Sequence, residues 1–547
     1  MKNLLLTIVL TISFFHSNFA QNKLSETEKF ATTAKIWGFL KYYHPNVANG
    51  EYNWDEQLFK VLPKVKSASN PNELSLIYLD WINSLGKIEK CKKCGSQRSV
   101  QYFDKNFNLS WINTSRLINP ELSEKLNYIE KNRHQGKKKY VAYYSGKPKM
   151  THITNEKDHI GFNWQDVKFR LLSLFRYWNI VEYFFPSKYQ IDTEWDEVLK
   201  KMIPKFLNAN SETDFHLSMN ELAVSIDDSH VRLNTNKTYL YFGHFYLPVQ
   251  FKLIDNKAII TGIYNDSLAK LNDLKIGDII TKANGKTIES IFNEEEKYIS
   301  GSNISRKKFN ASYYLLNGPT DSIRIEILRK GKATTKSVKR YLFKDFKYKK
   351  NEITETYKIL DGNIGYINIG AIKNIPETMK ALEKTKAIIF DIRKTTQFTP
   401  WNFTNYITSQ SRDFYKGLYP DLNYPGKFLW TKPYKSGNKK LKYKGKVILL
   451  VDESCQSQKE FTAMCLQVGD NVTTIGRQTS GADGNVVPFN MVGGYKTQIT
   501  GVGIFYPNGI ATQRKGVKID VEVKSTIAGV TTGKDEILEK AIQYINE

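Results

Sequence analysis

The chain has 547 residues, of which 41% are hydrophobic and 25% are charged. That length is too great for one hydrophobic core and indicates about three or four domains. The composition excludes a disordered, collagen-like or multi-span membrane chain. Lys and Arg number 80 against 55 acidic residues, a formal charge of +25. These basic residues are mostly scattered lysines, so we expect no nucleic-acid partner, only weak attraction to anionic envelopes or acidic substrates.

The first residues have the pattern of a targeting segment. Lys2 precedes an apolar run at 4–10, and the stretch closes at Ala20 before polar Gln21. This order is typical of a secretory signal peptide, residues 1–20, cleaved near Ala20. The alternative is a membrane anchor, but the apolar run is shorter than the roughly 20 residues that span a bilayer. We therefore expect an exported protein, periplasmic or secreted, without an integral membrane span.

Four cysteines in an exported chain permit two disulfides, and the three possible pairings cannot be ranked from sequence. Cys91 and Cys94 form a lone CKKC with no second Cys or His pair at zinc-knuckle spacing. A Cys91–Cys94 disulfide, or a pair of nearby thiols, is therefore favoured over a metal site. Cys455 and Cys465 are expected to be packed thiols.

An internal repeat occupies the N-terminal part of the chain. Trp37 recurs as Trp178, and Trp54 recurs as Trp195, at a constant offset of 178 − 37 = 141 residues. Apolar spacing of three and four, closed by Pro, predicts a helical hairpin in each copy, with first helices at 35–43 and 176–185. The indoles are expected to face the interior. The Lys-rich stretch at about 87–160 is interpreted as a small β-containing insertion.

From about residue 240 the pattern changes to short strands, at 249–253, 258–261 and 274–280, before an Asn-Gly turn. The run LKIGDIITKANGKTI resembles the PDZ-domain signature, which predicts a PDZ-like β domain over 239–345; an unrelated small β domain is the alternative. The resemblance implies that this domain holds an extended chain terminus as an added strand. The residues that it assigns to peptide binding are Gly243, His244, Phe245 and Leu247.

The last third of the chain alternates buried strands with helices, as an α/β sheet requires. Expected strands are 364–369, 387–392, 446–451 and 472–475, and expected helices are 377–384, 459–468 and 534–544. Ser457 lies between an expected strand and an expected helix, beside backbone N–H groups at the helix start that could stabilise an oxyanion. Ser457 with Glu460 also forms an S-x-x-E capping box, which needs no chemistry at all.

The order of these parts resembles the C-terminal processing, or tail-specific, serine peptidases. The resemblance implies a crotonase-like (ClpP-like) peptidase core over 346–547, with Ser457 as nucleophile and Glu460 as a structural residue. Many family members use a lysine base, but Ala482 holds that position here. The tricorn-core branch uses a histidine in an S-H turn instead, which corresponds to Ser229-His230. A neutral imidazole suits proton abstraction from a serine hydroxyl.

Two departures from the family concern the groups around the nucleophile. Gln513 stands where the branch has a supporting glutamate, and an amide cannot supply a negative charge. The turn that gives the family a glycine N–H in the oxyanion hole carries no glycine here, which leaves Thr396 as the candidate for the second donor. Gln458, which follows the nucleophile, is the candidate for the first backbone donor.

These observations predict a multidomain α+β and α/β protein with the N-terminal hairpin and insertion at 21–160, the second hairpin region at 161–238, and the PDZ-like and peptidase domains after them. The predicted function is a serine peptidase that hydrolyses proteins or peptides with a Ser457–His230 dyad, and no metal or organic cofactor. The rival hypothesis is a catalytically silent relative that binds peptides. The sequence leaves the oligomeric state open.

Overall fold

The computed structural model describes residues 24–97, 100–348, 355–394, 401–438 and 442–547. The predicted signal peptide at 1–20 lies outside these residues. Contacts divide the chain into two compact units. The first comprises Met1–Ser99, Asn108–Tyr140 and Leu199–Pro204, and the second comprises Val100–Phe107, Val141–Val198 and Lys205–Glu547.

The first unit is helical and is built around a pair of stacked indoles. Nε1 of Trp37 donates to the Trp54 carbonyl at 3.2 Å, and Nε1 of Trp54 donates to the Trp37 carbonyl at 3.1 Å. The predicted Cys91–Cys94 disulfide is confirmed. The elements of this unit are α2 (Glu26–Tyr43), α3 (Pro45–Asn49), α4 (Trp54–Ser67), α5 (Pro71–Asn83), η1 (Cys94–Gln97), α6 (Trp111–Thr114) and α7 (Pro120–Lys131).

The second copy of the repeat has the same indole geometry. Trp178 and Trp195 exchange the same two hydrogen bonds at 2.9 and 3.0 Å, and both pairs of rings are stacked. The sequence prediction of two similar hairpins with inward-facing indoles is therefore confirmed. This copy consists of α8 (Val167–Phe184), η2 (Lys188–Gln190) and α9 (Trp195–Leu207), followed by α10 (Glu212–Val224) and α11 (Asn236–Phe242).

A small β domain follows, with an antiparallel sheet in the order β4-β5-β6-β8-β9 and β7 paired to β6. The strand predicted at 274–280 begins only at Ile279, because the Lys275 N–H donates to the Asp278 carboxylate at 2.9 Å and closes a turn. Its elements are β3 (Phe245–Tyr246), β4 (Val249–Ile254), β5 (Lys257–Ile263), α12 (Asp266–Leu271), β6 (Ile279–Ala283), β7 (Lys286–Thr287), α13 (Ile288–Glu295), η3 (Glu296–Tyr298), α14 (Ile304–Ala311), β8 (Ser322–Arg329), β9 (Lys332–Lys339), β10 (Tyr341–Leu342) and η4 (Phe343–Phe346).

The C-terminal sheet has the order β11-β12-β13-β17-β18-β22 and is parallel except for β11. Successive residues of β13 join two different cores: Ile388 and Phe390 pack with α15, α16 and α17, whereas Ile389 packs with α19. Helices on both faces explain the unbroken apolar runs of the central strands. The elements are β11 (Tyr357–Leu360), β12 (Ile364–Asn368), η5 (Ile369–Ala371), α15 (Ile375–Ala381), β13 (Ala387–Asp391), α16 (Trp401–Ile407), β17 (Lys446–Val451), α17 (Gln458–Leu466), β18 (Val472–Gly476), β22 (Val521–Glu522), α18 (Ile527–Thr531) and α19 (Glu536–Asn546).

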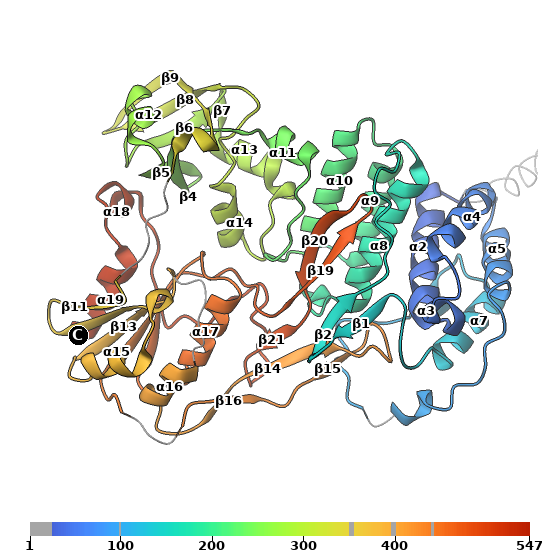
Figure 1. Ribbon diagram of the computed structural model, residues 1–547. Coiled ribbons are helices and arrows are strands. Elements are labelled where there is room, and N and C mark those ends of the chain that lie inside the picture. Colours follow the sequence, from blue (N-terminus) through green and yellow to red (C-terminus); the bar gives the residue numbers. More distant parts are fainter. Residues whose placement is uncertain (1–23, 98–99, 349–354, 395–400, 439–441) are drawn as a thin grey trace, which may run out of the picture. The chain divides into compact units, whose positions relative to one another are not determined.

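Antiparallel ribbons complete the second unit; β1–β2 falls within the β-containing insertion expected at about 87–160, whereas the other ribbons were not predicted from the sequence. The ribbon β19–β20 contacts β2 and lies beside helix α8 (Figure 1). Strand β20 carries Thr500, which reaches the site described below. The ribbons comprise β1 (Val141–Tyr144), β2 (Lys147–Ile153), β14 (Arg412–Pro420), β15 (Phe428–Trp430), β16 (Tyr434–Ser436), β19 (Val486–Met491), β20 (Tyr495–Thr500) and β21 (Gly503–Phe505).

Candidate active site

Ser457 lies in the loop between β17 and α17, immediately before the first residue of the helix. Its backbone has φ 56° and ψ −120°, a left-handed conformation that non-glycine residues rarely adopt and that costs about 1–3 kcal/mol. The strained backbone is held in place by a hydrogen bond from the Ser457 N–H to the Ala482 carbonyl at 2.9 Å. Backbone strain of this kind persists only where the surrounding fold holds it in place, and it is most common at functional sites.

Glu460 fastens this turn to the segment that follows β18. Its buried carboxylate accepts from the Thr479 hydroxyl at 2.5 Å, the Gly481 N–H at 2.7 Å and the Ala482 N–H at 3.0 Å. It also accepts from the Ser457 N–H at 3.3 Å, which is the carboxylate half of a capping box. Burial raises the pKa of Glu460, although these hydrogen bonds act against the rise. Glu460 therefore positions the serine turn, and Ala482 contributes only its backbone.

The sheet brings three chain segments to this point. Strands β13, β17 and β18 are parallel neighbours, so their carboxyl ends open at the same edge, where α/β sheets bind ligands. The Arg393 carbonyl, just beyond β13, accepts hydrogen bonds from Ser454 and Lys459 on either side of Ser457. Gly476, at the end of β18, can only be glycine because an added Cβ would meet the Val451 carbonyl oxygen at 1.9 Å.

His230 lies in the loop between α10 and α11, with only 5% of its surface exposed. Its Nδ1 lies 2.8 Å from the Thr500 hydroxyl, which donates to the Asp228 carboxylate at 2.9 Å. The Thr500 N–H binds the same carboxylate at 2.7 Å. Because the hydroxyl proton is directed to Asp228, Thr500 accepts from His230, which places the imidazole proton on Nδ1. Within the described part of the chain Nε2 has no hydrogen-bond partner, so its lone pair is available for a proton.

The pKa of His230 is lowered from its ordinary value. Burial is the main cause, the positive charges of Arg232 and Arg306 add to it, and the Asp228 carboxylate opposes both. The imidazole is therefore neutral at pH 7, the form that a general base requires.

Hydrogen bonds join the loop that carries His230 to the loop that carries Ser457. Nε2 of Gln456 donates to the Ser229 carbonyl at 3.1 Å. The Ser229 hydroxyl donates to the Ser480 carbonyl at 3.0 Å, and the Ser480 N–H donates to the Cys455 carbonyl at 2.8 Å. The residues directly before His230 and directly before Ser457 are thus in contact, although they are 227 positions apart.

Gln513 belongs to the same hydrogen-bond network through Ser302. Its Nε2 donates to the Ser302 hydroxyl at 3.4 Å. Ser302 and Ser229 are doubly joined, by N–H to hydroxyl bonds of 2.7 and 2.8 Å. The buried Gln513 side chain therefore connects to the residue before His230 only through Ser302, and as a donor of a neutral hydrogen bond.

The two predicted oxyanion donors are the backbone N–H groups of Gln458 and Thr396. Gln458 is the first residue of α17, at the positive end of the helix dipole. Thr396 lies outside the described residues. The free thiols Cys455 and Cys465 are buried, as expected of packed cysteines.

The peptide-binding residues assigned from the PDZ resemblance lie at the start of the β domain. The Gly243 N–H donates to the Tyr239 carbonyl, and the Phe245 N–H donates to the Gly318 carbonyl, both at 3.2 Å. Strand β3, with Phe245, pairs with β10, and Leu247 is buried in the domain core. His244 follows Gly243, and within the described residues its Nδ1 is buried without a hydrogen-bond partner. A carboxylate at this segment would need backbone amides other than the two already bonded.

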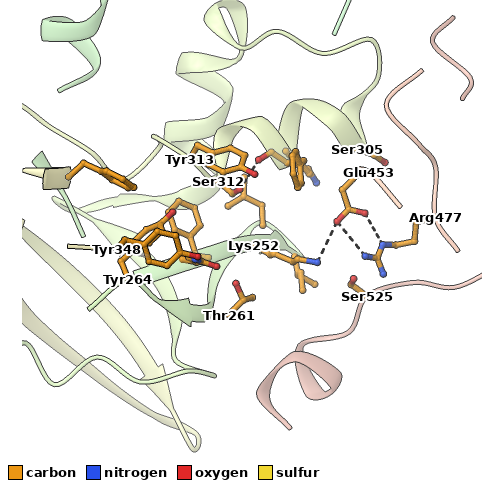
Figure 2. Close-up of a pocket in the computed structure, with 17 residues that line it drawn as sticks. Lys252, Thr261, Tyr264, Ser305, Ser312, Tyr313, Tyr348, Glu453, Arg477 and Ser525 are labelled. Carbon is orange, nitrogen blue, oxygen red and sulfur yellow. Dashed lines mark hydrogen bonds and ion pairs between the residues drawn. The ribbon is translucent and has the colours of Figure 1, made fainter. Parts of the chain in front are cut away.

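A groove lies elsewhere on the same domain. Strand β4 pairs only with β5 among the described strands, and α14 packs against it. The pocket beside them has a volume of about 590 Å³. Figure 2 shows Lys252 of β4 pointing toward Glu453, which in turn meets Arg477; the Lys252–Glu453 distance is 3.7 Å and the Arg477–Glu453 distance is 3.0 Å. Glu453 precedes Ser457 in the same loop, so the groove extends to the serine loop.

Two residues of the site were not predicted from the sequence. Asp228 and Thr500 hold the His230 ring, yet they are 272 positions apart. Asp228 stands two residues before His230, and this spacing was the only sequence signal. Nothing in the sequence near Thr500 marks it, because it reaches the site through the unpredicted ribbon β19–β20.

Comparison with known proteins adds to this geometry. Residues 402–523 match the model of peptidase family S41. The match includes Ser457, Glu460 and Gln513 but less than half of the chain. No curated protein matches the sequence.

Among solved structures, mature CPAF complexed with lactacystin is similar, with a TM-score of 0.54 and 13% identity over 70% of this chain and 99% of CPAF. A CPAF mutant gives a TM-score of 0.55 at 12% identity, over 70% and 98% of the two chains. At these identities the likeness establishes a shared fold. In the described part of the chain, no helix combines the length and the apolar character that crossing a membrane requires.

Proposed function

We propose that the protein is an exported serine peptidase of the tail-specific type, in which Ser457 is the nucleophile and His230 the general base. The observation that carries the proposal is the joining of a strained serine turn at a helix N-terminus to a neutral, Asp228-supported histidine through Gln456 and Ser229. The match to peptidase family S41 and the shared fold support a peptidase.

In this mechanism Nε2 of His230 takes the proton of the Ser457 hydroxyl as the oxygen attacks a peptide carbonyl. The Gln458 N–H and the α17 dipole stabilise the oxyanion, and His230 returns the proton to the leaving amine. Water then hydrolyses the acyl-serine with His230 again as base. Thr500 and Asp228 hold the imidazole in the tautomer that leaves Nε2 unprotonated.

The groove between β4 and α14 is the proposed site for the end of the substrate chain. The edge of β4 that faces away from β5, which pairs with no other described strand, can accept a peptide as an additional strand, and the positive charge of Lys252 suits a terminal carboxylate. This placement replaces the 243–247 amides as the main candidate, because the Gly243 and Phe245 amides are occupied.

Export is supported by two features. Residues 1–20 have the pattern of a signal peptide. The Cys91–Cys94 disulfide is typical of oxidising compartments outside the cytosol.

Hydrolysis of unstructured peptides, followed by mass spectrometry of the products, tests the activity. Ser457→Ala and His230→Ala should each abolish turnover to a similar extent, because members of one catalytic unit fail together. Ser411→Ala, an exposed serine outside the site, is the matched control. If wild-type protein binds peptides but none is cleaved, the silent peptide-binding relative is the correct function.

A further inference from the structure

A second pocket lies beside the loop that carries His230, on the side of the β domain. It has a volume of about 620 Å³ and is lined by residues of the 229–234 loop, α11 and α14. Ser229 and Val231, on either side of His230 in the chain, contribute to its wall, whereas His230 itself is not among the lining residues.

Two arginines give this pocket a positive charge that its own walls do not balance. Arg232 and Arg306 both line it, and none of the described lining residues is Asp or Glu. Each guanidinium is close enough to His230 to lower its pKa, and they also repel each other. No ion pair to either arginine occurs among the described residues.

Arg306 is held in a fixed position while part of its guanidinium remains unused. Its Nη1 donates to the Glu453 carbonyl at 3.0 Å, and its guanidinium lies 4.7 Å from the centre of the Phe309 ring. Its Nε is buried and has no partner within the described part of the chain. Arg306 is only partly exposed whereas Arg232 is exposed, so an anion in this pocket would meet one partly desolvated cation and one solvated cation. The planar fork of a guanidinium fits a carboxylate best, by two parallel hydrogen bonds.

We propose that Arg232 and Arg306 form a carboxylate-binding subsite that selects peptide substrates with an acidic group beside the scissile bond. The inference rests on the proposed peptidase function, since it assumes that a peptide reaches Ser457. The carboxylate is an Asp or Glu side chain, since the terminal carboxylate is assigned to the β4–α14 groove; a terminal carboxylate in this pocket is the outcome that the amidated peptides distinguish. The excess of basic residues in the chain also favours acidic peptides.

Binding to full-length Ser457→Ala protein tests this without depending on turnover. Fluorescence anisotropy would compare labelled peptides that differ by one internal Glu or Gln, each made with a free or an amidated C-terminus. A Glu peptide should bind about ten- to a hundredfold more tightly than its Gln partner, the range for hydrogen bonds to charged groups. If amidation alone weakens binding in an arginine-dependent manner, the terminal group is the ligand.

Arg232→Gln and Arg306→Gln, each added to Ser457→Ala, should abolish the preference. Arg324→Gln, on the exposed face of β8 and outside the pocket, should retain it. Arg306→Lys keeps a charge and serves as a second variant if Arg306→Gln fails to fold; it should retain part of the preference. Equal affinities for all four peptides, or a preference that survives both Gln variants, would overturn the inference. If the wild-type protein cleaves peptides but shows no preference for Glu over Gln, the subsite is refuted and the peptidase function stands. If Glu peptides bind more tightly but no peptide is cleaved, the peptidase function is refuted and the subsite stands.

Discussion

At the residue scale, the Thr500 hydroxyl decides which nitrogen of His230 is free. It donates to Asp228 and therefore accepts from Nδ1, so the lone pair of Nε2 is left for the serine proton. A carboxylate thus supports the histidine even though Gln513 replaces the expected glutamate. For this reason we expect Gln513→Glu to change the rate little, whereas Asp228 should matter.

Asp228→Asn should lower kcat/KM by about ten- to a hundredfold, the equivalent of one charge-assisted hydrogen bond. Asp228 raises the pKa of His230 against the effects of burial and the arginines, so its removal should also lower that pKa further. In the wild type, kcat/KM should rise with pH through one ionisation below pH 6.5, and in the variant the midpoint should lie lower still. Pre-steady-state or steady-state assays from about pH 4.5 to 8 measure both effects. Asp255→Asn, in an exposed turn, is the control, and an unchanged midpoint in Asp228→Asn would contradict this assignment.

Asp483 is a buried carboxyl group that should make stability depend on pH. Burial, and then the nearby Glu460, raise its pKa well above the ordinary value, and within the described residues its Oδ2 has no hydrogen-bond partner. The folded protein then holds this proton more tightly than the unfolded chain does. Stability should therefore fall as pH rises from the unfolded pKa of about 3.9 toward the folded value, by up to about 1.4 kcal/mol per pH unit.

Asp483→Asn removes this titration. The variant should gain stability over the wild type as pH increases above about 4, with no gain below it. Urea unfolding at several pH values measures the difference, and Asp104→Asn, an exposed substitution, is the control. A gain that is independent of pH would show that the pKa of Asp483 is not responsible.

At the scale of the element, the repeated hairpins were predictable because each depends on local sequence: apolar spacing, a Pro stop and a Trp at the same position. The central strands were also predictable, since β13 and β17 are apolar runs buried on both faces. The ribbons β14–β16 and β19–β20 were not, although their strands pair with near neighbours in the sequence, because their residues mix polar and aromatic types without a clear period.

The buried indole pairs predict the stability of each hairpin. Trp37→Ala and Trp178→Ala should each reduce the free energy of unfolding by about 3–5 kcal/mol, because each removes a fully buried ring and a hydrogen bond to its paired helix. Denaturant unfolding followed by circular dichroism gives the values. Trp401→Ala, at an indole 41% exposed, should cost less. Losses below about 1 kcal/mol at both repeat positions would be inconsistent with the packing described.

The β4–α14 groove predicts recognition of a chain end. Amidating the C-terminus of a bound peptide should weaken binding to Ser457→Ala protein by about tenfold. Lys252→Gln should remove that difference, whereas Lys332→Gln, on exposed β9, should not. Isothermal titration calorimetry with free-acid and amidated peptides measures this difference in affinity. Equal affinities in the parent protein would mean that the domain is a spacer or a lid.

At the scale of the whole molecule, the site depends on contacts that no local pattern reveals. Ser457 and Glu460 could be found from a short motif, and His230 from its resemblance to an S-H turn. The pairing of Asp228 with Thr500, 272 positions apart, and the joining of Gln456 to Ser229 arise only when the sheet, the β20 ribbon and the 228–230 loop fold together. The sequence therefore indicated the chemical groups, while their support and their local electrostatics required the structure.

Labelling with a fluorophosphonate tests the central claim most directly, since the reagent reacts with a serine only when the hydroxyl is activated. Tryptic cleavage after Lys446 and Lys459 places Ser457 in one peptide with Ser454, whose hydroxyl is bonded to Asp452, so this neighbour is an internal control. Wild-type protein should be labelled at Ser457 alone in this peptide, and His230→Ala should lose the label by about 10²- to 10⁴-fold in rate, the contribution of a general base. An unlabelled Ser457, or equally fast labelling without His230, would contradict the dyad and leave Ser457 as the start of a helix.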